Sequence, residues 1–200
     1  MSEMSIELRD GVAIVGFFSL LIASLAKAGA FPVHTWLPEY TEAAPSSISA
    51  FLPASLDKLL GIYFLTRICT NIFVLRQWAI LLLLLIGSIT IIAAVMMALV
   101  QHNYKKLLGY HAVSQVGYMV TGIGLGTPLG IAGGLFHMIN NALYKSGLFL
   151  AGGATEKQTN EEELDKLGGL AVYMPITFFS ALIFALSISC LLYTSPSPRD

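Results

Sequence analysis

The chain has 200 residues, of which 56% are hydrophobic and only 12% are charged, and its formal net charge is -1. Soluble domains are far less apolar, and no lysine or arginine block is present to follow a phosphate backbone, so a soluble fold and a nucleic-acid partner are both disfavoured. Apolar runs long enough to cross about 30 Å of hydrocarbon recur along the sequence, which predicts an all-α, polytopic transmembrane helical bundle in a lipid bilayer.

About six membrane-crossing helices are predicted within residues 1–190. In chain order they occupy about residues 11–30, 47–68, 78–100, 107–125, 129–152 and 174–192. The stretch from Thr155 to Lys166 is markedly polar and is predicted to be a solvated loop or a surface helix. The last ten residues, 191–200, form an abrupt Ser/Pro-rich segment after an apolar helix, and we expect them to be a non-native tail.

The segment after the first helix is predicted to contain a helix break. It runs through Phe31-Pro32 to Pro38 and is too proline-rich and too short to cross a membrane alone. We expect Pro32 and Pro38 to interrupt the helix at membrane depth or at an interface. Lys27 precedes this break. It is either a snorkelling lysine that reaches the headgroups or part of an ion path, and the break favours the ion path because half-helix ends bind ions.

Lys58 lies midway through the second helix, directly after Asp57. A lysine at the centre of a membrane helix costs about 2.5–3.5 kcal/mol on insertion scales. Because adjacent helical residues point about 100° apart, Asp57 does not simply face it. Lys58 therefore either lines a hydrated cavity or is matched by a carboxylate on another helix. The alternative is a local Asp57–Lys58 pair near a helix end, after a break at Pro53.

The fifth predicted helix carries one polar stripe. His137, Asn141, Tyr144 and Lys145 are spaced at i, i+4, i+7 and i+8, which places them on one side of a helix. A histidine titrates near neutrality, and burial allows a lysine to release its proton more readily, so the stripe is typical of a proton relay. Asn141, Tyr144 and, on the fourth helix, Ser114 are predicted to hold water along it. Hydrogen bonding that only locks helices together is the alternative.

The sequence offers no support for bond-making chemistry in this chain. Its two cysteines, Cys69 and Cys190, are far apart, and no CxxC pair, HExxH, GxSxG, P-loop or Rossmann pattern occurs. We therefore expect no catalytic residue, no cofactor and no metal site in this chain.

Several segments, in order, resemble a known family. Lys27–Glu39, Tyr104–Met119 and Leu135–Leu150 are similar to signatures of the antiporter-like subunits of NADH:quinone oxidoreductase (complex I), membrane-bound hydrogenases and multisubunit Na+/H+ antiporters. Pro53–Tyr63 and Asn140–Ser146 look closest to the hydrogenase-type members. The resemblance covers nearly the whole chain and implies a fragment of an inverted-repeat transporter fold in which each repeat contains a discontinuous helix.

The resemblance also implies roles for particular residues. It aligns Lys27 with the family lysine of the first broken helix, Lys58 with a lysine of the following helix, His137 with a central histidine and Lys145 with a basic residue of the same helix. Asn141 stands where some members carry a second histidine. The glutamate that pairs with the Lys27-type lysine is expected upstream of this chain, and the lysine of the second broken helix beyond Ser189.

The implied function is translocation of protons, or of Na+, by the antiporter-like subunit of a redox-driven respiratory complex. Expected partners are other membrane subunits and a peripheral redox arm, and the expected location is a prokaryotic plasma membrane. The chain itself would hold no redox site. Alternatives are a subunit of a stand-alone multisubunit Na+/H+ antiporter and a purely structural membrane anchor. The transported ion and the electron donor stay open.

Overall fold

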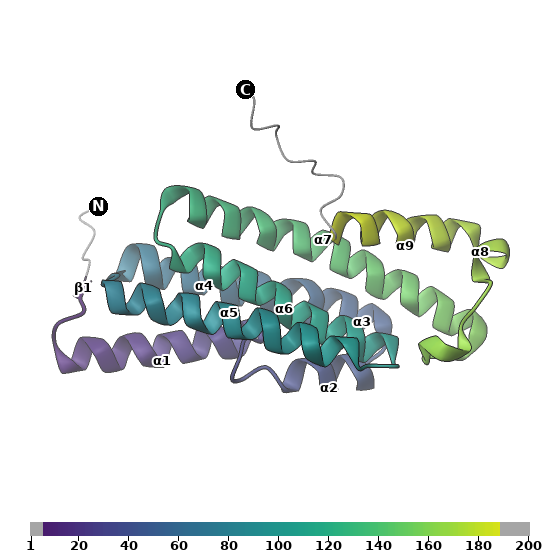
Figure 1. Ribbon diagram of the computed structural model, residues 1–200, viewed down its shortest axis with the longest axis horizontal. Helices are drawn as coiled ribbons and strands as arrows, with labels where there is room; N and C mark the ends of the chain where they lie inside the picture. The colour runs from purple at the N-terminus through teal and green to yellow at the C-terminus, as the bar shows by residue number, and fades with distance from the viewer. Residues whose placement is uncertain (1–5, 189–200) are drawn as a thin grey trace, which may run out of the picture.

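The computed structural model of the chain describes residues 6–188, most of which lie in helices that run roughly along one long axis (Figure 1). The predicted non-native tail and the end of the last predicted helix lie outside the described residues. Helices occupy all six predicted segments within that range. They are joined by short connections, and two small strands pair in parallel through Ile6–Phe73 and Glu7–Val74.

The elements have the following bounds: β1 Ile6–Glu7, α1 Gly11–Ala28, α2 Trp36–Ala43, α3 Ser46–Phe51, η1 Leu52–Leu56, α4 Asp57–Arg67, η2 Ile68–Ile72, β2 Phe73–Val74, α5 Gln77–Leu99, α6 Tyr104–Gly124, α7 Pro128–Thr159, η3 Leu164–Lys166, α8 Leu170–Tyr173 and α9 Pro175–Ile188. α3, η1, α4 and η2 follow one another without interruption, so the second predicted crossing is one helix with two π-helical turns. The first π-helical turn contains Pro53, which has no N–H to donate, and wider turns of this kind accommodate such a gap.

Two polar caps fix where the polar helices begin. The Asn103 side chain accepts hydrogen bonds from the backbone N–H groups of Lys105 at 2.9 Å and Lys106 at 3.2 Å, which starts α6. At α7 the Thr127 hydroxyl accepts from Gly130 N–H at 3.1 Å. α7 continues to Thr159, two turns beyond the predicted end at residue 152, so part of the polar stretch from Thr155 is helical.

Small residues let the helices approach one another closely. A Cβ added at Gly117 of α6 would lie 2.7 Å from the carbonyl oxygen of Gly87 on α5, and one at Gly61 of α4 would lie 2.6 Å from the backbone nitrogen of Ala28 on α1. Such contacts are typical of membrane helices, where close van der Waals packing replaces the hydrophobic effect. The buried core between α1, α4, α5 and α6 includes Phe17, Leu21, Leu65, Leu83 and Met119.

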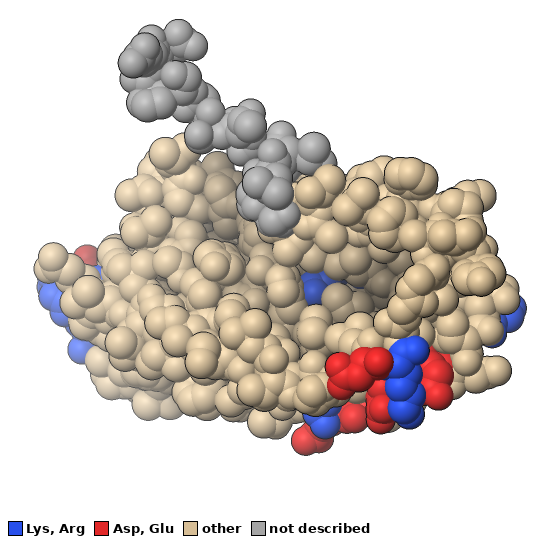
Figure 2. Space-filling model, turned by 45° about the vertical axis from the view of Figure 1, so that its right-hand side comes forward, with Lys and Arg blue, Asp and Glu red and all other residues tan. Residues whose placement is uncertain are grey.

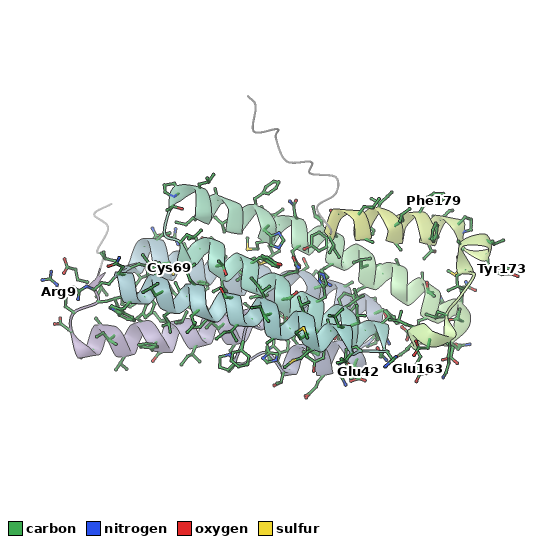
Figure 3. All side chains as sticks on the ribbon, viewed as in Figure 1. Arg9, Glu42, Cys69, Glu163, Tyr173 and Phe179 are labelled. Atoms are coloured by element: carbon green, nitrogen blue, oxygen red, sulfur yellow. The ribbon has the colours of Figure 1, made fainter. Side chains whose placement is uncertain are left out.

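Charge and apolar surface are separated along the bundle. Most of the surface in Figure 2 is uncharged; charged residues show at the left-hand edge, in a small basic patch near the middle and, as the largest group, with acidic residues around basic ones, toward the right-hand end. Glu42 and Glu163 lie at that end, and Arg9 lies at the opposite end (Figure 3). The outer faces of the helices expose large apolar side chains, such as Leu81, Ile92 and Phe179. This distribution is that of an integral membrane protein.

Three helices are long and apolar enough to cross a membrane by length and composition: Gly11–Ala28, Ser46–Ile72 and Gln77–Leu99. α6 and α7 are also long, with 21 and 32 residues, but carry many polar residues. Several of these polar side chains are turned into the bundle, which is where membrane proteins keep them.

Candidate functional site

The break between α1 and α2 forms one flank of the candidate site. α1 ends before Gly29, which turns the chain with φ 78° in the left-handed region. The indole N–H of Trp36 donates to the Ala26 carbonyl at 3.0 Å. Across the bundle, Phe31 N–H donates to the Thr90 hydroxyl at 3.2 Å. These bonds hold the interrupted backbone in place and leave a helix end, with its partial charge, beside the interior of the bundle.

Of the two predicted helix breakers, only Pro32 lies in the break. Pro38 is the third residue of α2, so it lies within a helix and not between α1 and α2. N–H groups in the first turn of a helix have no intrahelical partner, so a proline there costs no hydrogen bond. Pro38 instead packs against α6, where a Cβ added at Gly109 would lie 2.9 Å from Pro38 Cα.

Lys27 and Asp57 form an ion pair between the last turn of α1 and the first turn of α4. The Lys27 side chain is 50% exposed, whereas that of Asp57 is 15% exposed. The ion pair that Asp57 makes is therefore with α1 and not with its neighbour Lys58, although the charge of Asp57 also acts on Lys58. The pair also gives Lys27 a carboxylate partner within the described part of the chain.

Lys58 is buried without a partner. Its residue is 2% exposed, and within residues 6–188 its Nζ atom has neither a hydrogen bond nor a carboxylate. Of the two explanations from sequence, pairing with a carboxylate on another helix is not found in this range. A hydrated cavity around Lys58 is the remaining explanation, and it stays a prediction, because an isolated ammonium group is costly in an apolar interior.

The predicted stripe on α7 faces the bundle. Lys145 is fully buried, and its Nζ donates to the Leu108 carbonyl of α6 at 3.1 Å. Asn141 is also fully buried, and neither its amide nitrogen nor its amide oxygen has a hydrogen-bond partner among the described residues. The charge of Lys145 acts on that of Lys58, since the two amines interact electrostatically across the contact between α4 and α7.

The other two members of the stripe meet at one glutamine. The Nε2 atom of His137 lies 2.8 Å from Gln115 Oε1, and the Tyr144 hydroxyl donates to the same oxygen at 3.0 Å. Because this oxygen only accepts, the hydrogen bond requires His137 to carry its proton on Nε2. His137 and Gln115 also line an open pocket of about 560 Å3, whose walls include Gly130 and Gly134.

On α6, Ser114 was predicted from the sequence as a site residue, whereas Gln115 was not. Ser114 is buried, and its hydroxyl donates to the His111 carbonyl of its own helix at 2.8 Å. Gln115 and His111 were not among the predicted site residues, although Gln115 joins two members of the stripe. Their spacing of four residues, which places both polar side chains on one face of α6, is the sequence signal that could have identified them.

A second charged group closes the end of the bundle at the start of α6. Lys105 Nζ contacts Glu156 Oε1 at 2.8 Å and Glu162 Oε1 at 2.6 Å. Glu156 also accepts hydrogen bonds from the Tyr104 hydroxyl at 2.6 Å and the Ser46 hydroxyl at 2.9 Å. We call these five residues the end cluster. It ties the beginnings of α3 and α6 to the end of α7 and the segment after it.

The electrostatics of the end cluster favour the charged forms of Lys105 and Glu156. Burial raises the pKa of Glu156, but hydrogen bonds from Lys105, Tyr104 and Ser46 outweigh burial and hold that pKa at about 2. Burial lowers the pKa of Lys105, and the hydrogen bonds to Glu156 and Glu162 reverse this, so its pKa is raised overall. Near neutral pH Lys105 and Glu156 therefore carry fixed charges.

Comparison with known proteins identifies the family of this chain. Residues 3–194 match the family model described as NADH:quinone oxidoreductase/Mrp antiporter, TM. The chain belongs to this family. It is 34% identical over 94% of its length to a Na(+)/H(+) antiporter subunit of Alkalihalophilus pseudofirmus, of which it covers 39%. It is 32% identical over 95% of its length to hydrogenase-4 component B of Escherichia coli, of which it covers 30%.

Solved structures of antiporter-family proteins have the same fold. The chain matches the structure of the Mrp complex from Dietzia with a TM-score of 0.86 and 29% identity, over 90% of this chain and 34% of the matched one. It matches respiratory complex I from Thermus thermophilus, with bound NADH, with a TM-score of 0.82 and 29% identity, over 91% and 39%. The resemblance predicted from sequence and the predicted fragment of the antiporter-like fold are thus confirmed. The likeness to hydrogenase-type members in particular stays a prediction.

This antiporter-family chain shows no grouping of metal ligands in the described range: within residues 6–188, no three His, Cys, Asp or Glu side chains are placed to hold a metal ion. The roles predicted for Lys27, Lys58, His137 and Lys145 concern transport. The three lysines lie in two kinds of surroundings. Lys27 has a carboxylate partner and partial exposure, whereas Lys58 and Lys145 are buried without a carboxylate within that range.

Proposed function

We propose that the full-length protein translocates protons, or Na+, across a membrane as the antiporter-like subunit of a redox-driven respiratory complex, either an NADH:quinone oxidoreductase or a membrane-bound hydrogenase. The observation that carries the proposal is the pair Lys58 and Lys145. Both amines are buried in the bundle, they act on each other electrostatically, and neither is paired with a carboxylate within residues 6–188. A purely structural bundle gains little from two such costly groups.

The arrangement supports stepwise movement of charge. The Lys27–Asp57 pair lies on one flank, Lys58 and Lys145 lie in the interior, and His137 lies beside the open pocket on α7. Two like charges in a medium of low dielectric constant repel each other strongly. A proton that loads Lys58 therefore favours release of a proton from Lys145, and the reverse also holds. Such mutual exclusion moves protons in sequence along the helices.

The proposed surroundings are other membrane subunits, a peripheral redox arm and a prokaryotic plasma membrane. The support is the similarity to hydrogenase-4 component B of Escherichia coli and the structural match to respiratory complex I of Thermus thermophilus. A further match, with a TM-score of 0.79 and 28% identity, is the membrane-bound sulfane sulfur reductase, described as an archaeal respiratory membrane complex. Electron transfer is assigned to those partners, and we propose no cofactor in this chain.

The test uses the full-length protein, assembled with its partner subunits in proteoliposomes, and follows internal pH with a fluorescent dye. Lys58→Met and Lys145→Met keep most of the side-chain volume and remove the amine. We expect each to lower donor-driven proton transport by about tenfold or more, a conservative share of what a positioned proton-transfer group contributes. Lys166→Met removes an exposed lysine of the surface loop and is the matched control. Normal transport in both Lys58→Met and Lys145→Met would contradict the proposal and would favour the alternative that the protein is a structural anchor.

A stand-alone multisubunit Na+/H+ antiporter is the second candidate. It is favoured by the 34% identity to the Na(+)/H(+) antiporter protein of Alkalihalophilus pseudofirmus and by the TM-score of 0.86 with the Mrp complex. The two candidates differ in what drives transport. If addition of Na+ collapses a preformed pH gradient with no electron donor present, the stand-alone antiporter is correct. If proton movement requires oxidation of a donor such as NADH, the redox-driven complex is correct.

A further inference from the structure

The contact between α6 and α7 has a regular register. The two helices follow each other with a short connection, so they run antiparallel, and each turn of α6 meets a turn of α7. Lys145 contacts Leu108, and His137 contacts Gln115. Further along, a Cβ added at Gly134 would lie 3.1 Å from the Met119 carbonyl oxygen, and one at Gly122 would lie 3.0 Å from the Gly130 carbonyl oxygen.

From one contact to the next turn, the residue number on α6 rises by three or four and the residue number on α7 falls by three or four. The turn between the Leu108–Lys145 and Gln115–His137 contacts belongs to His111 on α6 and Asn141 on α7. His111 lies three residues after Leu108 and four before Gln115, on the same face of the helix. His111 and Asn141 are therefore expected to face each other.

Both of these side chains have polar atoms without partners. The Nδ1 atom of His111 is enclosed and makes no hydrogen bond within residues 6–188, and the same is true of both polar atoms of the Asn141 amide. Buried polar groups in proteins are almost always satisfied, if necessary by water. His111 Nδ1 and the two polar atoms of the Asn141 amide therefore indicate a buried water between the two turns. These three atoms supply the two to four polar partners that a buried water needs.

The same space lies between the charged groups of the site. His111 interacts electrostatically with Lys145 and His137 of α7 and with Lys58 of α4. His137 and Lys145 are eight residues apart on α7, about 12 Å along its axis, which is too far for direct proton transfer. His111 lies about halfway between their contacts on α6.

We propose that His111 carries protons between Lys145 and the group formed by His137, Gln115 and Tyr144, through water held between His111 and Asn141. The inference rests on the proposed function, because it names a further proton carrier on the same path. An imidazole takes up a proton on one ring nitrogen and releases one from the other, so its charge is restored after each transfer. His111 is the only histidine on α6 between Leu108 and Gln115.

The first experiment replaces His111 by glutamine in the full-length protein, assembled in its complex in proteoliposomes. Glutamine keeps a hydrogen-bonding side chain of similar size and does not carry a proton. We expect normal assembly and an initial rate of proton transport that is lower by about tenfold, the lower part of the range for loss of a positioned proton-transfer group. His102→Gln is the matched control, since His102 is a surface histidine whose side chain is 74% exposed. A wild-type rate in His111→Gln overturns the inference.

A chemical rescue separates proton transfer from packing. His111→Gly leaves space for a small ring, and transport is measured with added imidazole or with pyrazole, a ring of the same size that is not protonated near neutral pH. Restoration of transport by imidazole alone is the expected result. Equal restoration by both rings shows that His111 only fills space and overturns the inference.

A third measurement does not depend on whether any variant assembles. In a high-resolution map of the unaltered complex, we expect an ordered water within hydrogen-bond distance of His111 Nδ1 and of the Asn141 amide. A dry gap there overturns the inference. If Lys58→Met and Lys145→Met abolish transport while His111→Gln does not, only this inference fails. If the wild-type complex moves no ions, the proposed function itself fails.

Discussion

Glu156→Gln is the sharpest test of how the end cluster holds the bundle together. The substitution removes the charge that faces Lys105, whose side chain is 5% exposed and whose amine lies 2.8 Å from Glu156. Breaking a buried ion pair by removing one partner costs about 3–5 kcal/mol. Because Lys105 keeps Glu162, whose own side chain is 35% exposed, we expect a smaller loss, of about 2 kcal/mol in the free energy of unfolding.

The pH dependence of this loss has a definite sign. The pKa of Glu156 is held at about 2 in the folded protein, below its ordinary value of 4.5, which corresponds to roughly 3 kcal/mol of stabilisation and is of the same order as the loss above. A depressed pKa stabilises the folded state fully above the unfolded value and ceases to do so as the pH falls through the folded value. The difference between wild type and Glu156→Gln should therefore be full at neutral pH and shrink between pH 4.5 and about 2.

The assay is thermal unfolding of the purified full-length protein in detergent, followed by tryptophan fluorescence. Glu163→Gln is the matched control, because it is the same substitution in the same segment at a carboxylate whose side chain is 55% exposed and whose partner Lys166 lies 3.0 Å away on the surface. Exposed pairs contribute about 0–1 kcal/mol. Equal unfolding temperatures for the two variants at neutral pH would refute the view that Glu156 holds the end of α7 to α6.

Two further substitutions test the flank formed by α1 and α4. Asp57→Asn removes the carboxylate of Lys27, so we expect slower proton transport with normal assembly and substantial recovery in Asp57→Glu; identical rates in all three proteins would contradict a role for the pair. Gly61→Ala adds a methyl group 2.6 Å from the Ala28 backbone nitrogen and should destabilise the protein by about 1–3 kcal/mol in thermal unfolding. An unchanged unfolding temperature would show that α1 and α4 do not pack this closely.

The helices and the α7 stripe were predictable because each depends on a short-range pattern. An apolar run of about 20 residues identifies a crossing wherever it occurs, and a period of 3.6 residues places His137, Asn141 and Lys145 on one face without knowledge of the partner helix. The extent of α7 was not predictable from polarity. Glu156 lies in a stretch whose polarity predicts solvation, and only the continuation of α7 to Thr159 brings it to Lys105.

Which charged residues form ion pairs could not be predicted from the sequence, for a different reason. The Lys27–Asp57 pair joins residues 30 positions apart on separate helices, and Asp57 has a nearer lysine beside it in the chain. Which lysine it meets depends on the rotation of α4, and the π-helical turn at Leu52–Leu56 changes that rotation just before Asp57. The contact of Gln115 with His137 likewise depends on the register between α6 and α7, which no single helix specifies.

The lysines of the described residues differ in what it costs to change their charge. Lys105 is held by two carboxylates and by the neighbours that lower the pKa of Glu156, so removing its proton would leave buried negative charge behind. Neither Lys58 nor Lys145 forms an ion pair with a carboxylate in that range, and although the charge of Asp57 acts on Lys58, each amine is opposed by the other. Fixed charges at the end of the bundle stabilise one structure. Unpaired amines in its interior provide two charge states within one structure, which is the property that moving a proton through a rigid bundle requires.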